Sequence, residues 1–185
     1  MLQKESKNGI YIGAVCCMAL LFFSFSVNKI SPRLQEKLNS AVQTTFEVEE
    51  FSLDLVSISS SLNGKTAIEL GGENFFKVVQ NEKLIGYAYL GEAPSMKDVF
   101  DYVVLFNTDL SIKKSKVLIY RENHGRQIGS QRWLKQFIGM GVDRVIRYGE
   151  DVDAIAGATI SAKSMTKAVN DVLKSVGILK SEGIL

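Results

Sequence analysis

One uncharged apolar segment near the start of the chain constrains its fold more than any other feature. The stretch from Ile10 to Val27 reads IYIGAVCCMALLFFSFSV, eighteen residues without a charge. As a helix it would be about 27 Å long, close to the thickness of the hydrocarbon core of a bilayer. The segment has no polar face, which disfavours a helix buried in a globular core. We therefore predict a short N-terminal tail over residues 1–9 and one transmembrane anchor over residues 10–27.

A cleaved signal peptide is the alternative interpretation of this segment. Ser24 and Ser26, on either side of Phe25, supply small residues in the A-x-A-like spacing of a cleavage site. Basic residues lie both before and after the apolar stretch, so the positive-inside rule hardly discriminates between the two orientations.

The scarcity of metal-binding side chains excludes several kinds of redox centre. The two cysteines, Cys16 and Cys17, both lie in the apolar segment, and His124 is the only histidine. Residues 28–185 therefore cannot form a disulfide, an iron–sulfur cluster on thiolates, a C-x-x-C-H haem attachment or a histidine-rich metal site. Any redox chemistry there requires an organic cofactor. The net charge of +2 gives no reason to expect a nucleic acid partner.

The rest of the chain predicts an α+β domain. Ser31 and Pro32 suit a helix N-cap and first turn, and apolar residues then recur every four positions up to Val42. Residues 47–72 carry no clear pattern beyond loop and turn signals. We predict a membrane-proximal helix and linking region over residues 28–72, a main domain over residues 73–177 and a C-terminal tail over residues 178–185.

The main domain is predicted to hold four strands followed by two helices. Runs rich in β-branched and aromatic residues predict strands at 75–80, 84–90, 102–106 and 116–120, the first two joined as a hairpin. Trp133, Leu134, Phe137 and Ile138 form one helical stripe, and a second runs from Met165 to Val176 and ends at Gly177. The result is a mostly antiparallel sheet with packed helices.

The segment before the last predicted helix carries the candidate chemistry. Residues 153–159 read D-A-I-A-G-A-T. A hydroxyl at a helix start lies among backbone N–H groups that lack helical partners, and these groups and the helix dipole favour a phosphate. Gly157 permits a tight turn and Ala158 leaves room for a bulky group. The plainer alternative is that Thr159 is an ordinary N-cap.

This pattern resembles the FMN-binding domain family, whose members include the G subunit of Rnf complexes and the C subunit of the sodium-pumping NADH:quinone reductase. The family signature is an aspartate followed by [ST]-G-A-T, which Asp153, Gly157, Ala158 and Thr159 match; Ala156 departs from the usual Ser or Thr. The resemblance extends over about residues 83–173. It includes Tyr120-Arg121-Glu122, Gly125 and the W-x-x-x-F-x-G of residues 133–139.

The resemblance implies a covalent cofactor and a set of residues that hold it. In the family a flavin transferase uses FAD to esterify the threonine, which implies covalent FMN on Thr159 and a recognition role for Asp153. The loop after residue 120 lies against the flavin ring in the family, which implies a role for Glu122 and Gly125; a solvated turn carboxylate is the alternative for Glu122. The implied FMN-binding residues are Asp153, Ala156, Gly157, Ala158, Thr159, Glu122 and Gly125.

The expected function is that of a membrane-anchored flavoprotein which relays electrons between redox partners at the outer face of the cytoplasmic membrane. The family's transferase works outside the cytoplasm, which places the domain there. Expected partners are that transferase, membrane or extracytoplasmic redox proteins and the membrane itself. An accessory or carrier role is favoured over a stand-alone enzyme. Two alternatives remain, a membrane-tethered binding or structural domain without flavin and an FMN-dependent reductase with its own small substrate.

Overall fold

The computed structural model describes residues 30–70 and 72–185. The predicted transmembrane helix at residues 10–27 lies outside the described residues. Within the described part of the chain, none of the helices combines the length and apolar character that crossing a membrane requires.

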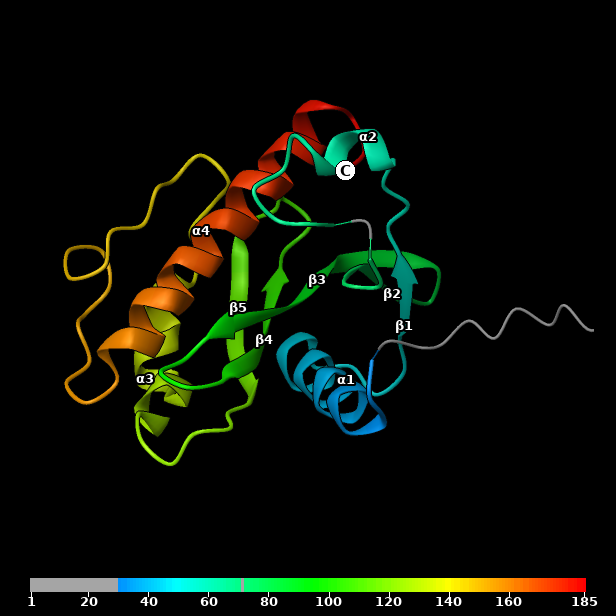
Figure 1. Cartoon of the computed structure of the whole chain (residues 1–185). Coiled ribbons are helices and arrows are strands. Elements are labelled where there is room, and N and C mark those ends of the chain that lie inside the picture. The colour runs from blue at the N-terminus through cyan, green and yellow to red at the C-terminus, as the bar shows by residue number, and fades with distance from the viewer. Residues whose placement is uncertain (1–29, 71) are drawn as a thin grey trace, which may run out of the picture.

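A five-stranded antiparallel sheet forms the centre of the fold. Its strands follow one another in space in the same order as in the sequence. Each strand therefore pairs with the next through a local connection, which makes the sheet a simple meander (Figure 1). The strands are β1 (Ser52–Leu55), β2 (Phe75–Gln80), β3 (Lys83–Pro94), β4 (Val99–Phe106) and β5 (Ile112–Ile119).

The predicted hairpin and the two later strands are confirmed: β2 has the predicted bounds, whereas β3, β4 and β5 are longer than predicted. β2 and β3 are joined by Asn81 and Glu82, which both have positive φ angles, of 48° and 63°. Two such residues in succession are the pattern of the hairpin turn whose twist matches that of the flanking strands. β3, β4 and β5 extend beyond the apolar runs of the sequence because polar residues such as Glu92, Asp101 and Lys113 interrupt those runs without ending the strands.

Two elements in the unassigned stretch escaped prediction. β1 pairs only with β2 and is an edge strand, and most of its side chains are exposed. It therefore lacks the alternation of buried and exposed residues that marks a half-buried strand. Ser60–Asn63, predicted as loop, forms the single-turn helix α2, with Ser59 as its N-cap.

The two faces of the sheet carry separate hydrophobic cores. In β3, Tyr87 and Tyr89 face one core, whereas Ala88 and Leu90 face the other, as strand alternation requires. α1 (Pro32–Phe46) covers the second face, and α3 (Gln131–Leu134) and α4 (Thr159–Ser181) cover the first (Figure 1). The helix predicted after Ser31 is thus confirmed as α1, and the Ser31 hydroxyl accepts the Leu34 N–H over 3.3 Å.

The predicted stripe at 133–138 forms a shorter helix than expected. α3 is one turn long and continues as the 3₁₀ turn η2 (Lys135–Phe137). Trp133, Leu134 and Phe137 are buried as predicted, but Ile138 is extended and 51% exposed, so its place in the stripe was wrong. The chain turns away at Gly139, where φ is +80°.

The predicted end of the last helix at Gly177 is also wrong. α4 passes through Gly177 and ends at Ser181. Leu179, beyond the glycine, is fully buried in the core, and this packing outweighs the roughly 1 kcal/mol that glycine costs in a helix. A Cβ on Gly177 would lie 3.3 Å from the Cβ of Val142, so the glycine lets the preceding loop approach α4 closely.

The architecture confirms the α+β class and the antiparallel sheet. Because α4 lies across one face, its first residue stands at one edge of the molecule, beside the connection between β3 and β4 (Figure 1). The motif at residues 153–159 leads directly into that end of α4.

Candidate functional site

Thr159 is the first residue of α4. The N-cap is Ala158, whose side chain cannot accept a hydrogen bond, so Thr159 does not cap the helix. Its side chain is exposed, and its hydroxyl donates only to the Ile155 carbonyl oxygen, over 3.3 Å. The Ala158 N–H also donates to that carbonyl, over 3.2 Å. Loss of the threonine proton would therefore leave Ile155 satisfied.

The backbone at the start of α4 offers donors to an anion. The first N–H of the helix that reaches an acceptor one turn back belongs to Ala162, which donates to the Ala158 carbonyl oxygen over 2.9 Å. The N–H groups of residues 159–161 come before it, and helix geometry provides them with no acceptor inside α4. α4 is 23 residues long, so the positive end of a full helix dipole also lies here.

Two hydroxyls lie within this first turn, and the fold separates them. Ser161 is 3% exposed, and its hydroxyl lies 2.9 Å from the Tyr120 hydroxyl. Thr159 faces the solvent. The structure therefore leaves Thr159 as the accessible nucleophile of the turn, a distinction that spacing in the sequence does not make.

Gly125 brings the loop after β5 against the motif. Its φ is +78°, and a Cβ there would lie 2.7 Å from the Tyr120 hydroxyl and 3.4 Å from the Gly157 carbonyl oxygen. Gly157 also has a positive φ, of +77°. Two glycines more than thirty residues apart in the sequence thus meet at one site, and both adopt a conformation that favours glycine.

Glu122 is bound to the turn between β3 and β4. Its Oε1 accepts the Ser95 hydroxyl and the Lys97 N–H, each over 2.6 Å. The Ser95 hydroxyl, with smaller contributions from the N–H groups of Lys97 and its neighbours, holds the pKa of the Glu122 carboxyl below its ordinary value of 4.5. Glu122 is therefore a turn carboxylate that is held by hydrogen bonds and borders the hollow containing Thr159.

The backbone of Asp153 is clamped, whereas its carboxylate is free. The Trp133 indole N–H donates to the Asp153 carbonyl oxygen over 2.7 Å, and the Asp153 N–H donates to the Gln136 side chain over 2.9 Å. Among the described residues, no hydrogen bond or ion pair to the exposed Asp153 carboxylate is found. The residue is thus held firmly in place while its charge points into solvent.

Three aromatic side chains, those of Tyr120, Trp133 and Tyr148, form hydrogen bonds with the motif or the first turn of α4. Trp133 is 5% exposed and packs edge-on against Phe137, so it belongs to the core. The Tyr148 hydroxyl accepts the Ile155 N–H over 3.3 Å and so holds the backbone of the motif. Tyr120 is half-buried at the site, with its ring 5.9 Å from that of Phe100.

Two surface hollows flank the motif. The first, of about 230 Å³, contains Thr159. The second, of about 270 Å³, contains Asp153 and the exposed Ala156. The first is lined by Met96, Tyr120, Glu122, His124, Gly125, Gly157, Ala158, Thr159, Ile160 and Ser161. The seven predicted site residues thus fall into two neighbouring groups, with Asp153 and Ala156 on one side and the other five at the Thr159 hollow.

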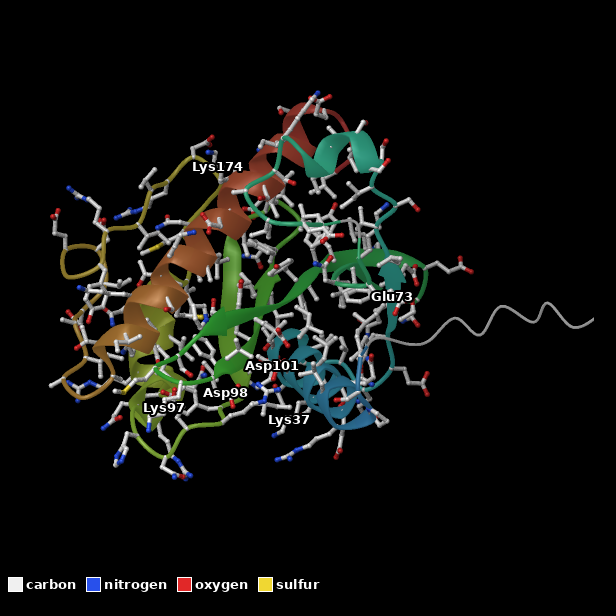
Figure 2. The ribbon with its side chains drawn as sticks, viewed as in Figure 1. Lys37, Glu73, Lys97, Asp98, Asp101 and Lys174 are labelled. Carbon is white, nitrogen blue, oxygen red and sulfur yellow. The ribbon has the colours of Figure 1, made fainter. Side chains whose placement is uncertain are left out.

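Another hollow is larger but does not contain these residues. It measures about 870 Å³ and lies beside the far half of α4, near Lys174. Figure 2 shows Lys174 toward that end of α4, whereas Lys97 and Asp98 lie near its first turn. Size alone therefore does not identify the candidate site; the exposed hydroxyl and the helix terminus do.

Sequence reasoning missed Ser95, Met96 and Ile160. Ser95 and Met96 lie in the turn between β3 and β4, whose sequence carries no pattern specific to a binding site. Ile160 follows the motif as an ordinary helical residue. Met96 and Ile160 line the hollow that contains Thr159, which forms only when the β3–β4 hairpin and α4 pack together. Ser95 is connected to this hollow through its hydrogen bond to Glu122.

Comparison with known families agrees with this geometry. Residues 95–174 match the family model of the FMN-binding domain, a segment that begins at the Ser95 turn and includes the whole site. This part of the chain is therefore similar to the FMN-binding domain family, and the match supports a flavin-binding protein with FMN as its cofactor. No curated protein matches the chain.

Proposed function

We propose that the protein carries FMN covalently, through a phosphoester on the hydroxyl of Thr159, and relays electrons. The observation that carries the proposal is the exposed Thr159 hydroxyl at the first turn of α4, inside the hollow of a domain that binds FMN. The neighbouring Ser161 hydroxyl is buried and paired with Tyr120, so only one hydroxyl of this turn is accessible to a modifying enzyme.

The attachment is a transfer of a phosphoryl group from FAD. The Thr159 oxygen bonds to the FMN-side phosphorus of FAD, the pyrophosphate bond breaks, and AMP leaves with the bridging oxygen. The threonine proton passes to a base of the flavin transferase. No net oxidation or reduction occurs, and FAD supplies the whole FMN group.

The start of α4 fits the resulting phosphodiester. The N–H groups of the first turn and the helix dipole stabilise a negative group there. Lys167 pairs with Asp171, whereas Lys163, one turn after Thr159, lies over the Tyr148 ring at 5.8 Å from its centre and keeps its charge. The backbone N–H groups of the first turn and the Lys163 charge therefore both contribute positive potential near Thr159.

The size of the hollow favours a covalent link over reversible binding. Pockets that bury a small ligand measure about 300–1,000 Å³, whereas the Thr159 hollow measures about 230 Å³. A shallow hollow buries little of a ligand and gives limited affinity. Even a Kd of about 1 μM, equivalent to about −8.2 kcal/mol, would let the site empty where free FMN is scarce. A covalent bond removes this dependence.

Asp153 is proposed as a residue that the transferase recognises. Its backbone is fixed by Trp133 and Gln136, and its carboxylate is exposed without a partner in the described part of the chain. A fixed, unpaired charge six residues before the threonine suits recognition by another protein. It has no evident part in the stability of the fold.

The same proposal places the domain outside the cytoplasm, held to the membrane by residues 10–27. FMN, when bound, exchanges one or two electrons, and the protein positions and tunes it. The flavin transferase and redox proteins at or outside the membrane are the proposed partners. An accessory or carrier role is supported by the shallow hollow, which leaves little room for a separate substrate beside the cofactor.

The test is the intact mass of protein produced together with a flavin transferase. We expect the mass of one FMN ester, and a fluorescent band after denaturing electrophoresis. Thr159→Ala should abolish both, because the only accessible hydroxyl of the turn is lost. Ser161→Ala is the matched control and should keep the ester. A bare polypeptide mass for the wild-type protein, or an unchanged ester in Thr159→Ala, would refute the proposal.

A second variant separates recognition from attachment. Asp153→Ala should lower the fraction of protein that carries FMN while the unfolding midpoint stays near that of the wild type. The carboxylate has no partner within the described residues, so its loss costs the fold little. Full occupancy in this variant would show that the transferase does not need Asp153.

A further inference from the structure

Two apolar side chains stand unusually exposed at the rim of the Thr159 hollow. Met96 is 70% exposed and Ile160 is 51% exposed. Scattered exposed apolar residues are ordinary on protein surfaces. These two, however, come from segments sixty residues apart and converge on the hydroxyl proposed to carry FMN.

The turn that carries Met96 is rigidly bonded. The Ser95 N–H donates to the Asp98 carbonyl oxygen over 2.7 Å, and the Val99 N–H donates to Asp98 Oδ1 over 2.7 Å. The Ser95 hydroxyl lies 2.8 Å from the same Asp98 carbonyl oxygen. An exposed methionine on such a turn is held in position without being buried itself.

Glu122 fastens this turn to the rest of the site. One of its carboxylate oxygens binds both the Ser95 hydroxyl and the Lys97 N–H, on either side of Met96. Charge-assisted hydrogen bonds of this length are among the strong ones in proteins. The carboxylate therefore fixes the two residues that flank Met96, and so keeps the backbone of Met96 beside the hollow.

The segment from Tyr120 to Gly125 links the hairpin to α4. On one side Arg121 pairs with the buried Asp101 of β4 at 2.7 Å and donates to the Val99 carbonyl oxygen at 3.0 Å. On the other side the Tyr120 hydroxyl meets Ser161, and Gly125 abuts Gly157. This segment thus helps to determine the relative position of Met96 and Thr159, together with the packing of α4 against β3.

We propose that Met96 and Ile160 form an apolar clamp for the flavin ring, and that Glu122 is the positioning residue which holds Met96 in it. The inference rests on the proposed attachment of FMN to Thr159. A flat aromatic ring gains by packing on apolar side chains, and a thioether makes favourable contacts with aromatic rings. The clamp covers part of the ring from water while the phosphate stays at the start of α4.

The experiment uses the FMN-loaded protein and measures quenching of its flavin fluorescence by iodide. Met96→Ala and Glu122→Ala should each raise the quenching constant about twofold, because one face of the ring loses its cover. Met96→Leu should restore the wild-type value, and Glu122→Gln, which keeps an acceptor oxygen, should restore part of it. Val145→Ala, at a side chain 77% exposed and away from the hollow, is the control for Met96→Ala.

The role of Glu122 has a second readout that does not involve the flavin. In the protein without FMN, Glu122→Ala should raise the hydrogen exchange rate of the Lys97 amide, whereas Glu82→Gln, at an exposed turn carboxylate, should not. Quenching constants equal in Met96→Ala, Glu122→Ala and Val145→Ala would overturn the clamp. Unchanged exchange of the Lys97 amide would overturn the role of Glu122.

The intact mass distinguishes this failure from failure of the attachment. An FMN ester in every variant, with equal quenching constants, would overturn the clamp alone. A wild-type mass without the ester would overturn the attachment, and the clamp with it.

Discussion

Two glycines give the site its shape, and the structure separates their roles. Gly157 has a positive φ but open space around its Cα, whereas Gly125 has a positive φ and closely approaching neighbours. A side chain at Gly157 would have free space, so its only cost would be the strain of a positive φ. At Gly125 it would meet strain and the Tyr120 hydroxyl, so the loop would have to move away from α4.

We predict a graded loss of stability at these positions. Gly157→Ala should lower the free energy of unfolding by about 1–2 kcal/mol, the cost of a left-handed conformation for an L-residue. Gly125→Ala should cost about 1–3 kcal/mol more, because overpacking adds to the strain. Urea unfolding of the FMN-free protein measures both. Gly129→Ala, with open space and no positive φ, is the control and should be close to neutral.

Equal stabilities of the two variants would contradict the close contact inferred at Gly125. If Gly129→Ala lowered the free energy of unfolding as much as Gly157→Ala, the loss would come from replacing any glycine and not from the positive φ.

At the level of elements, side chains help to hold the irregular segment between η2 and α4. Asp151 accepts the Arg147 N–H over 2.8 Å and pairs with the Arg147 and Arg144 guanidinium groups. Asn170 of α4 donates to the Ile146 carbonyl oxygen and accepts the Ile146 N–H, each over 2.8 Å. These contacts fix the residues that come shortly before Asp153, whose own backbone is held by Trp133 and Gln136.

The pKa of Asp151 predicts how this segment responds to acid. The Arg147 side chain, then its N–H and the Arg144 guanidinium, lower the pKa of the Asp151 carboxyl from 3.8 to about 2. Since the folded state has the lower pKa, the carboxylate contributes stability above about pH 4, and this is lost as the pH falls through about 2.

Asp151→Asn should therefore be less stable than the wild type at pH 7, and the difference should shrink between about pH 4 and pH 2. Urea unfolding of both proteins across this range measures the difference. Glu150→Gln, at a carboxylate 62% exposed, is the control and should show little change at any pH. A difference for Asp151→Asn that stays constant down to pH 2 would contradict the role of its charge.

At the scale of the whole molecule, the sheet separates the site from α1. The core under α4 contains Met165 and Val169, whereas the core under α1 contains Leu38 and Val42 on the opposite face. Damage to the α1 face should therefore reach the site only through global unfolding.

We predict that Leu38→Ala lowers the free energy of unfolding by about 2–5 kcal/mol, because Leu38 is fully buried and its truncation leaves a cavity. Under conditions where the variant remains folded, its intact mass after production with the transferase should show the same fraction of FMN ester as the wild type. Urea unfolding and mass spectrometry measure the two effects. Ser40→Ala, on the exposed side of α1, should change neither. A reduced ester fraction in folded Leu38→Ala would show that the two faces are coupled.

The sequence by itself determined the parts of this protein that depend on nearby residues. The N-cap of α1, the hairpin of β2 and β3, and the position of Thr159 at the start of a helix follow from local periodicity and local hydrogen bonds. The motif from Asp153 to Thr159 pointed to FMN, and the family match agrees.

Only the tertiary structure decided the relations between distant segments. It buried Ser161 while leaving Thr159 exposed, bonded Glu122 to the turn at Ser95, and carried α4 past Gly177 because Leu179 enters the core. None of these depends on residues close in sequence. Exposure, contact and the end of a buried helix are set by what packs against a segment, and that is determined when the whole chain folds.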